Sequence, residues 1–173
     1  MKGANFLLTT YRGREAEAAR EIKEHLARLG DQASKTFLTD VNGIVLGNTS
    51  LDPLQVSENL DSLAKNEPWN MRLVLRFIPI ETEVETSLEQ IVKMVKPLLS
   101  KIKADESFRV TVESRHSTLD KNDVIKKIAA LIDNKVDLEN PDWIVLVETI
   151  GNWTGISVLA PEKIFSSTKS KRS

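Results

Sequence analysis

The sequence predicts an α+β fold in which two units follow one another along the chain. Over residues 1–80, short apolar strands and amphipathic helices occur in the order β-α-β-β-α-β. Over residues 81–165 the order changes to helices followed by strands, which predicts a mixed sheet. Residues 166–173, SSTKSKRS, offer no apolar side chain to bury, so we expect a disordered basic tail.

The first unit begins with a strand over residues 5–9 and a helix over residues 14–29. In the helix, apolar residues recur at steps of three and four, and Gly30 follows where a helix can end with positive φ. Two further strands, residues 36–39 and 44–46, flank Asn42-Gly43, a dipeptide typical of tight turns.

A second helix is expected from Asp52 to about residue 65. Asp52 can cap its free N–H groups, and Pro53 suits the first helical position. A strand over residues 71–79 then ends at Pro79. The order β-α-β-β-α-β is that of a ferredoxin-like domain, which we predict for residues 1–80.

The second unit opens with a capping pattern at Ser87 and a long apolar stripe that continues to residue 102. Pro97 interrupts the stripe and should kink or divide the helix. A strand from Phe108, with its loop at residues 114–119, and a helix over residues 120–134 follow. Strands over residues 143–150 and 153–159 then form a hairpin across Gly151-Asn152.

Composition excludes several classes of protein. The 173 residues include no Cys, so neither a disulfide framework nor a thiol nucleophile is available. No apolar run reaches the roughly 20 residues that span a bilayer, so we expect no membrane partner, and the lack of Cys fits a cytoplasmic protein. The formal net charge is −1, but residues 86–136 carry 10 Lys and Arg against 7 Asp and Glu. Any nucleic-acid surface must therefore be a local patch.

No residue pattern indicates catalysis. The two histidines, His25 and His116, have no partners at metal-ligand spacing, and we expect His25 on the exposed face of its helix. Asp40 and Asp52 are better explained as turn and cap residues than as paired carboxylates. We therefore expect no catalytic residues, no metal and no cofactor.

Three stretches carry a family resemblance. Residues 108–159 contain the run Val136-Asp137-Leu138-Glu139-Asn140-Pro141-Asp142 directly before an apolar strand, an order that resembles the C-terminal half of a THUMP domain. Residues 71–82, MRLVLRFIPIET, and residues 7–15, LLTTYRGRE, resemble the stand-alone adaptor family of tRNA cytidine acetylation.

The resemblance implies a non-catalytic protein that binds tRNA near its acceptor end. It would present tRNA to a separate acetyltransferase that forms N4-acetylcytidine, and the chain leaves no room for a catalytic domain after the last predicted strand. One alternative is a general RNA-binding THUMP module that serves another tRNA-modifying enzyme. Another is a scaffold without an RNA role, which the near-neutral charge favours.

Candidate RNA-binding residues come from the predicted surfaces. Arg72 and Arg76 share one face of the predicted strand, and the resemblance places a basic residue such as Arg115 or His116 on the RNA-facing side. Lys121, Lys126 and Lys127 lie on or before the following helix, where lysines also occur simply as solvated side chains. Trp153 is a candidate for base stacking, although a large aromatic on a strand is more often part of the core.

Overall fold

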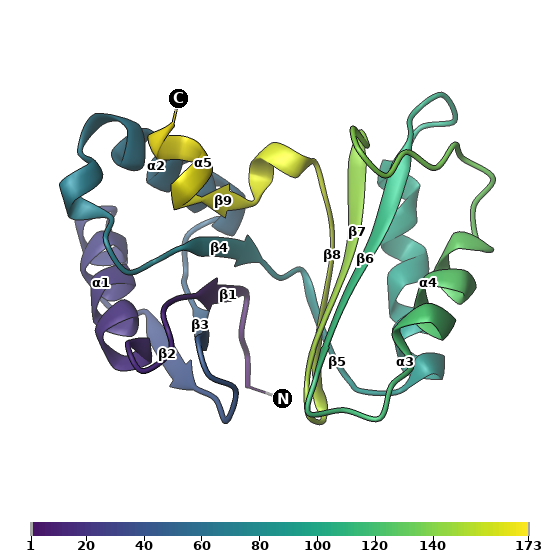
Figure 1. The fold of residues 1–173 in the computed structure, drawn as a ribbon, viewed down its shortest axis with the longest axis horizontal. Helices are drawn as coiled ribbons and strands as arrows, with labels where there is room; N and C mark the ends of the chain where they lie inside the picture. Colours follow the sequence, from purple (N-terminus) through teal and green to yellow (C-terminus); the bar gives the residue numbers. More distant parts are fainter. Residues whose placement is uncertain (1, 173) are drawn as a thin grey trace. The chain divides into compact units, whose positions relative to one another are not determined.

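The computed structural model describes residues 2–172, which divide into two compact units (Figure 1). The N-terminal unit comprises residues 2–80 together with residues 162–172, and the C-terminal unit comprises residues 81–161. Both units combine helices with a sheet. Within residues 2–172, no helix is long and apolar enough to cross a membrane.

The N-terminal unit contains a five-stranded sheet in the order β2-β3-β1-β4-β9, and every neighbouring pair in it is antiparallel. Its strands are β1 (Phe6–Thr9), β2 (Lys35–Leu38), β3 (Ile44–Asn48), β4 (Arg76–Pro79) and β9 (Phe165–Ser166). The helices α1 (Glu15–Arg28) and α2 (Pro53–Asn66) pack on this sheet, and a short 3₁₀ turn, η1 (Pro68–Asn70), follows α2. As the sequence predicts, Asp52 caps α2 by accepting the N–H of Leu54 at 3.0 Å.

The core of this unit is organised around two stacked aromatic rings. Phe6 on β1 and Phe77 on β4 are fully buried, with ring centroids 4.9 Å apart. The Phe6 ring lies over Gly47, where an added Cβ would come within 2.1 Å of ring carbon Cζ. A side chain at position 47 therefore requires the aromatic pair to move.

The strand expected over residues 71–79 is shorter in the structure and begins only at Arg76. Upstream of it, the Glu21 carboxylate accepts the backbone N–H groups of residues 72, 73 and 74, at 2.9, 3.0 and 2.8 Å. A side chain on α1 thus accepts the backbone hydrogen bonds that a neighbouring strand would otherwise accept. Arg72 consequently lies outside the strand and does not share a strand face with Arg76.

The expectation of a disordered tail is wrong for residues 166–171. Phe165 is 2% exposed and joins the core of the N-terminal unit, and β9 pairs with the edge of β4. The short helix α5 (Ser167–Lys171) packs on α2, where the Ser170 hydroxyl bonds to Asp61. The polar composition of residues 166–173 did not predict this order, because the buried ring that holds the segment belongs to Phe165, one residue earlier.

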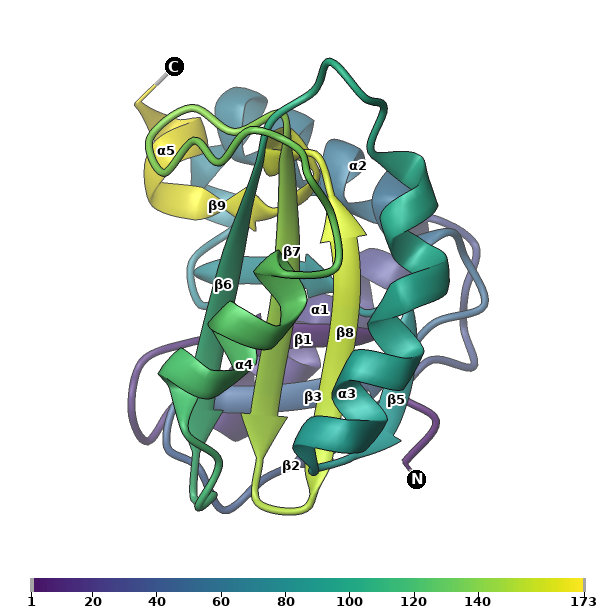
Figure 2. The same ribbon diagram turned by 90° about the vertical axis from the view of Figure 1, so that its right-hand side faces the viewer.

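The C-terminal unit contains a four-stranded sheet in the order β5-β8-β7-β6. Its strands are β5 (Thr82–Glu85), β6 (Phe108–Arg115), β7 (Trp143–Ile150) and β8 (Trp153–Leu159). β6 and β7 are parallel and the other pairs are antiparallel, which confirms a mixed sheet. The helices α3 (Leu88–Val95) and α4 (Lys121–Ala129) cover one face of it (Figure 2).

Two local features complete this unit. At Pro97 the α3 helix gives way to the 3₁₀ turn η2 (Lys96–Lys101), so Pro97 divides the predicted helix.

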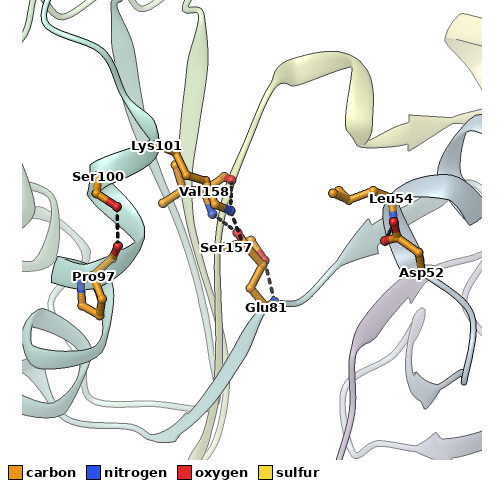
Figure 3. Close-up of polar contacts among 8 residues, drawn as sticks. All are labelled: Asp52, Leu54, Glu81, Pro97, Ser100, Lys101, Ser157 and Val158. Atoms are coloured by element: carbon orange, nitrogen blue, oxygen red, sulfur yellow. Dashed lines mark hydrogen bonds and ion pairs between the residues drawn. The ribbon is translucent and has the colours of Figure 1, made fainter.

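Glu81 bonds to Lys101 and accepts the N–H of Val158 at 2.7 Å, while its own N–H donates to the Ser157 hydroxyl (Figure 3). These bonds fix the segment leading into β5 against β8. A third 3₁₀ turn, η3 (Pro161–Lys163), follows β8.

Candidate nucleic-acid interface

A cleft of about 560 Å³ opens at one end of the sheet of the C-terminal unit. Three segments line it: residues 86–88 at the start of α3, residues 116–120 together with Asp123 in the first turn of α4, and the hairpin turn Gly151–Asn152. All three are loops or helix starts supported by the sheet, where binding residues are commonly found.

Capping residues fix the walls of this cleft. Ser87 accepts the N–H of Gln90 at 3.1 Å, and Asp120 accepts that of Asn122 at 2.8 Å. The N–H of Thr86 donates to the Asn152 carbonyl at 3.0 Å, which ties the α3 start to the hairpin turn. Two helix N-termini therefore flank the cleft, although the Asp120 carboxylate offsets part of their positive potential.

His116 lines the cleft and is exposed. It has φ of 53°, the only positive φ of a residue other than Gly among residues 2–172. Such backbone strain is uncommon and tends to occur where a loop is held in a particular shape. Here it turns the chain sharply out of β6 toward the start of α4.

Arg115 is the last residue of β6, so the loop expected to begin at residue 114 begins later. Its Nη1 donates to Oε2 of Glu148 on β7 at 2.6 Å, and the two side chains are 21% and 1% exposed. This guanidinium is engaged by a buried carboxylate, which makes Arg115 primarily a structural residue.

Trp153 does not present its ring for base stacking. The residue is 6% exposed on β8, and its Nε1–H donates to the Glu83 carboxylate at 2.8 Å. A stacking platform must expose the face of its ring. The proposed role of Trp153 is therefore wrong, and the ring belongs to the buried sheet.

The three candidate lysines, Lys121, Lys126 and Lys127, are all exposed, and none of them lies in an ion pair within residues 2–172. Lys121 opens α4 beside the cleft, whereas Lys126 and Lys127 lie in its last turn, roughly 8–9 Å further along the helix axis. Arg72 and Arg76 lie in the N-terminal unit, whereas the other predicted residues lie in the C-terminal unit.

Metal chemistry finds no support in the described part of the chain. No group of three or more His, Asp or Glu side chains within residues 2–172 is arranged to hold a metal ion. His25 is 6% exposed, and its Nε2 lies 2.9 Å from the Asn70 carbonyl oxygen. Its expected position on the exposed face of α1 is wrong, because it joins α1 to the turn after α2.

Comparison with known proteins identifies the C-terminal unit. A family model described as the THUMP domain matches residues 85–159. This unit is a THUMP domain. The match begins at the last residue of β5 and ends at the last residue of β8, so it covers β6, β7 and β8 and both helices on the sheet.

Two curated relatives extend the comparison. An uncharacterised protein of Methanocaldococcus jannaschii is 38% identical over 104 residues, which cover 57% of this chain and 29% of that protein. THUMP domain-containing protein 1 of Mus musculus is 26% identical over 134 residues, covering 72% of this chain and 38% of that protein. The chain thus spans about a third of the length of these relatives.

Solved structures share the fold at low identity. The crystal structure of a Pyrococcus horikoshii protein superposes with a TM-score of 0.65 and 20% identity, covering 94% of this chain and 55% of that one. A 4-thiouridine synthetase, solved in complex with RNA and with ATP bound, gives a TM-score of 0.50 at 16% identity. That match covers 94% of this chain and 42% of the synthetase.

Proposed function

We propose that this protein binds tRNA without catalysing a reaction and presents it to a separate acetyltransferase that forms N4-acetylcytidine. The observation that carries the proposal is the THUMP domain over residues 85–159. THUMP domains are RNA-binding modules associated with tRNA modification. The structure of a related fold in complex with RNA supports the same class of ligand.

The adaptor role rests on finer features. The stretches at residues 7–15 and 71–82 resemble the stand-alone adaptors of cytidine acetylation. The strand order β2-β3-β1-β4 of the N-terminal unit supports the ferredoxin-like assignment that accompanies this resemblance. A cytoplasmic location, where tRNA is modified, fits a chain without Cys.

The mode of binding follows from the chemistry of RNA. Base edges in the major groove of A-form RNA are inaccessible to side chains, so binding depends on phosphates and on unpaired nucleotides. The cleft at His116 and the neighbouring Lys121 offer polar groups to the end of a strand, and Lys126 and Lys127 extend a cationic face along α4.

A second candidate function is a THUMP module that serves another modifying enzyme. The thiouridine synthetase that shares the fold favours this alternative. The two functions differ in the partner and in the modified base, and both require tRNA binding.

The deciding experiment is mass spectrometry of tRNA nucleosides from a deletion strain. Loss of N4-acetylcytidine with all other modified nucleosides retained is the expected result. Loss of a different nucleoside would replace the adaptor role with the second candidate. In vitro, the purified chain should form no acetylcytidine from acetyl-CoA and unmodified tRNA, and product formed without a partner would overturn the non-catalytic assignment.

A further inference from the structure

The N-terminal unit, rather than the THUMP domain, carries the excess of positive charge. Residues 2–80 and 162–172 contain 14 Lys and Arg against 11 Asp and Glu, whereas residues 81–161 contain 10 against 14. Seven of the nine arginines lie in the N-terminal unit. Arginine is the side chain best suited to bidentate phosphate contacts, so this unit has the stronger means of binding a polyanion.

Several of these arginines surround one cleft of about 560 Å³. The loop after β1 contributes Tyr11 and Arg14, helix α1 contributes Arg20, and the segment before β4 contributes Arg72. Tyr11, the only tyrosine of the sequence, is 52% exposed. An exposed aromatic among guanidinium groups is the combination that binds unpaired nucleotides.

Acidic residues also line the cleft, but two of the three are engaged. Glu17 is paired with Arg14 at 2.5 Å, and Glu21 accepts the three backbone N–H groups of residues 72–74. Glu24 is the third. Arg20 and Arg72 are both exposed, and neither forms an ion pair within residues 2–172. Arg20 lies close enough to Glu17 to help lower the pKa of that carboxyl, but its guanidinium and that of Arg72 are exposed and accessible to an external anion.

The Glu21 contacts also hold Arg72 in place. Because the carboxylate accepts the N–H of Arg72 itself, the backbone at this position is fixed to the same helix that carries Arg20. The backbone positions that carry the two arginines are thus preorganised, which lowers part of the entropic cost of binding a ligand at the cleft.

We propose that this cleft is a second RNA contact, in which Arg20 and Arg72 bind backbone phosphates and Tyr11 stacks on an unpaired base. The proposal rests on the proposed tRNA binding and adds a separate contact in the N-terminal unit. An acidic protein segment would use the arginines but not the exposed ring, so single-stranded RNA fits the observed set of side chains better.

The test compares variants of the full chain in binding to bulk tRNA and to polyuridylate. Arg20→Gln with Arg72→Gln removes two cations from the cleft, and Lys23→Gln with Lys35→Gln removes two exposed cations of the same unit outside it. Affinity falls with salt, and the slope of log affinity against log salt is about −0.7 per phosphate contact of a single strand. Loss of two contacts in the arginine pair should therefore make this slope shallower by roughly 1.4. The lysine pair should change it much less.

A second comparison tests the aromatic ring. Tyr11→Ala should weaken polyuridylate binding by about tenfold, within the range for loss of one base–aromatic stack, and Tyr11→Phe should retain the affinity of the wild type.

Equal effects of the arginine and lysine pairs, or equal losses for Tyr11→Phe and Tyr11→Ala, would overturn the proposal. So would polyglutamate competing as well as polyuridylate, which would indicate an acidic protein ligand. If the wild type binds no tRNA, the proposed function itself fails; if it binds and these variants change nothing, only the second contact fails.

Discussion

Arg115 and Glu148 join the two parallel strands β6 and β7 through a hydrogen bond of 2.6 Å between Nη1 and Oε2. The carboxylate is 1% exposed, so it depends on partners inside the protein for its charge. The pair lies at the end of β6, directly before the strained residue His116. It therefore fixes the point at which the chain leaves the sheet and enters the candidate cleft.

Arg115→Ala should lower the free energy of unfolding by roughly 3 kcal/mol, because it removes the cation opposite a buried carboxylate. Arg115→Glu should cost more, since it adds a like charge beside Glu148. Urea denaturation provides the measurement, with Lys126→Ala as the control for an exposed cation in the same unit. A loss for Arg115→Ala no larger than that of the control would show that Glu148 does not need this partner.

Glu21→Ala should destabilise the protein by about 2 kcal/mol, because three backbone donors at residues 72–74 lose their acceptor. Glu24→Ala is the matched control, since Glu24 lies on the same helix, is exposed and accepts no backbone hydrogen bond from residues 72–74. Chemical denaturation should separate the two variants clearly. Equal stability of the two would mean that residues 72–74 find water or other acceptors.

Local patterns predicted most of the secondary structure but not the contacts between distant residues. The hairpin over Gly151-Asn152 and the Asp52 cap depend on neighbouring residues, and both are present. Residues 72–74 have strand-like composition, yet a carboxylate about 50 positions away accepts hydrogen bonds from their backbone N–H groups. Sequence spacing carries no information about that contact.

For the candidate site too, local spacing predicted which helix residues are exposed but not which strand residues pair with one another. Exposure of Lys121, Lys126 and Lys127 follows from helical spacing, and all three are exposed. Burial of Trp153 and pairing of Arg115 depend on which strands become neighbours, β8 with β5 and β6 with β7. Tyr11, Arg14 and Arg20 were missed because their cleft also needs Arg72, which follows them by more than 50 residues.

Asp31 should make stability depend on pH in the acid range. Burial alone would raise the pKa of this carboxyl, but hydrogen bonds from Thr49, Ser50 and Ala33 outweigh it and hold the pKa below its ordinary value. Because the pKa of Asp31 is lower in the folded state, its ionised carboxyl contributes fully to the free energy of unfolding above the pKa in the unfolded chain, about 3.9. This contribution is lost as pH falls through the pKa in the folded protein.

Asp31→Asn tests this dependence. The variant should be less stable than the wild type by about 1–3 kcal/mol near pH 6, since its amide N–H₂ group faces donors. The difference should shrink as pH falls below about 4, because the unfolded wild-type chain takes up a proton at Asp31 at a higher pH than the folded protein does. Unfolding free energies measured between pH 6 and pH 3 provide the comparison, and a constant difference would exclude Asp31 as the titrating group.

Phe165→Ala should destabilise the N-terminal unit by about 3 kcal/mol, because the ring is 2% exposed in the core of that unit. Thr168→Ala, at an exposed position three residues later, should change stability by less than about 0.5 kcal/mol. Amide hydrogen exchange should also show faster exchange at β4 in the Phe165 variant. If the two substitutions are equivalent, residues 165–171 contribute nothing to the fold in solution.

The last prediction locates the RNA surface of the THUMP domain. Lys121, Lys126 and Lys127 on α4 are exposed and unpaired within the described chain, so their joint replacement by Ala should leave the thermal midpoint nearly unchanged. If each contacts one phosphate, tRNA affinity should fall and the salt slope should decrease by roughly 2 to 3. The control replaces Lys93, Lys103 and Lys135, three exposed lysines of the same unit that lie outside α4, and so makes the same charge change. Filter binding at several salt concentrations distinguishes the two triple variants. Equal losses would mean that tRNA responds to the total charge of the unit, and the α4 surface would then have no special role.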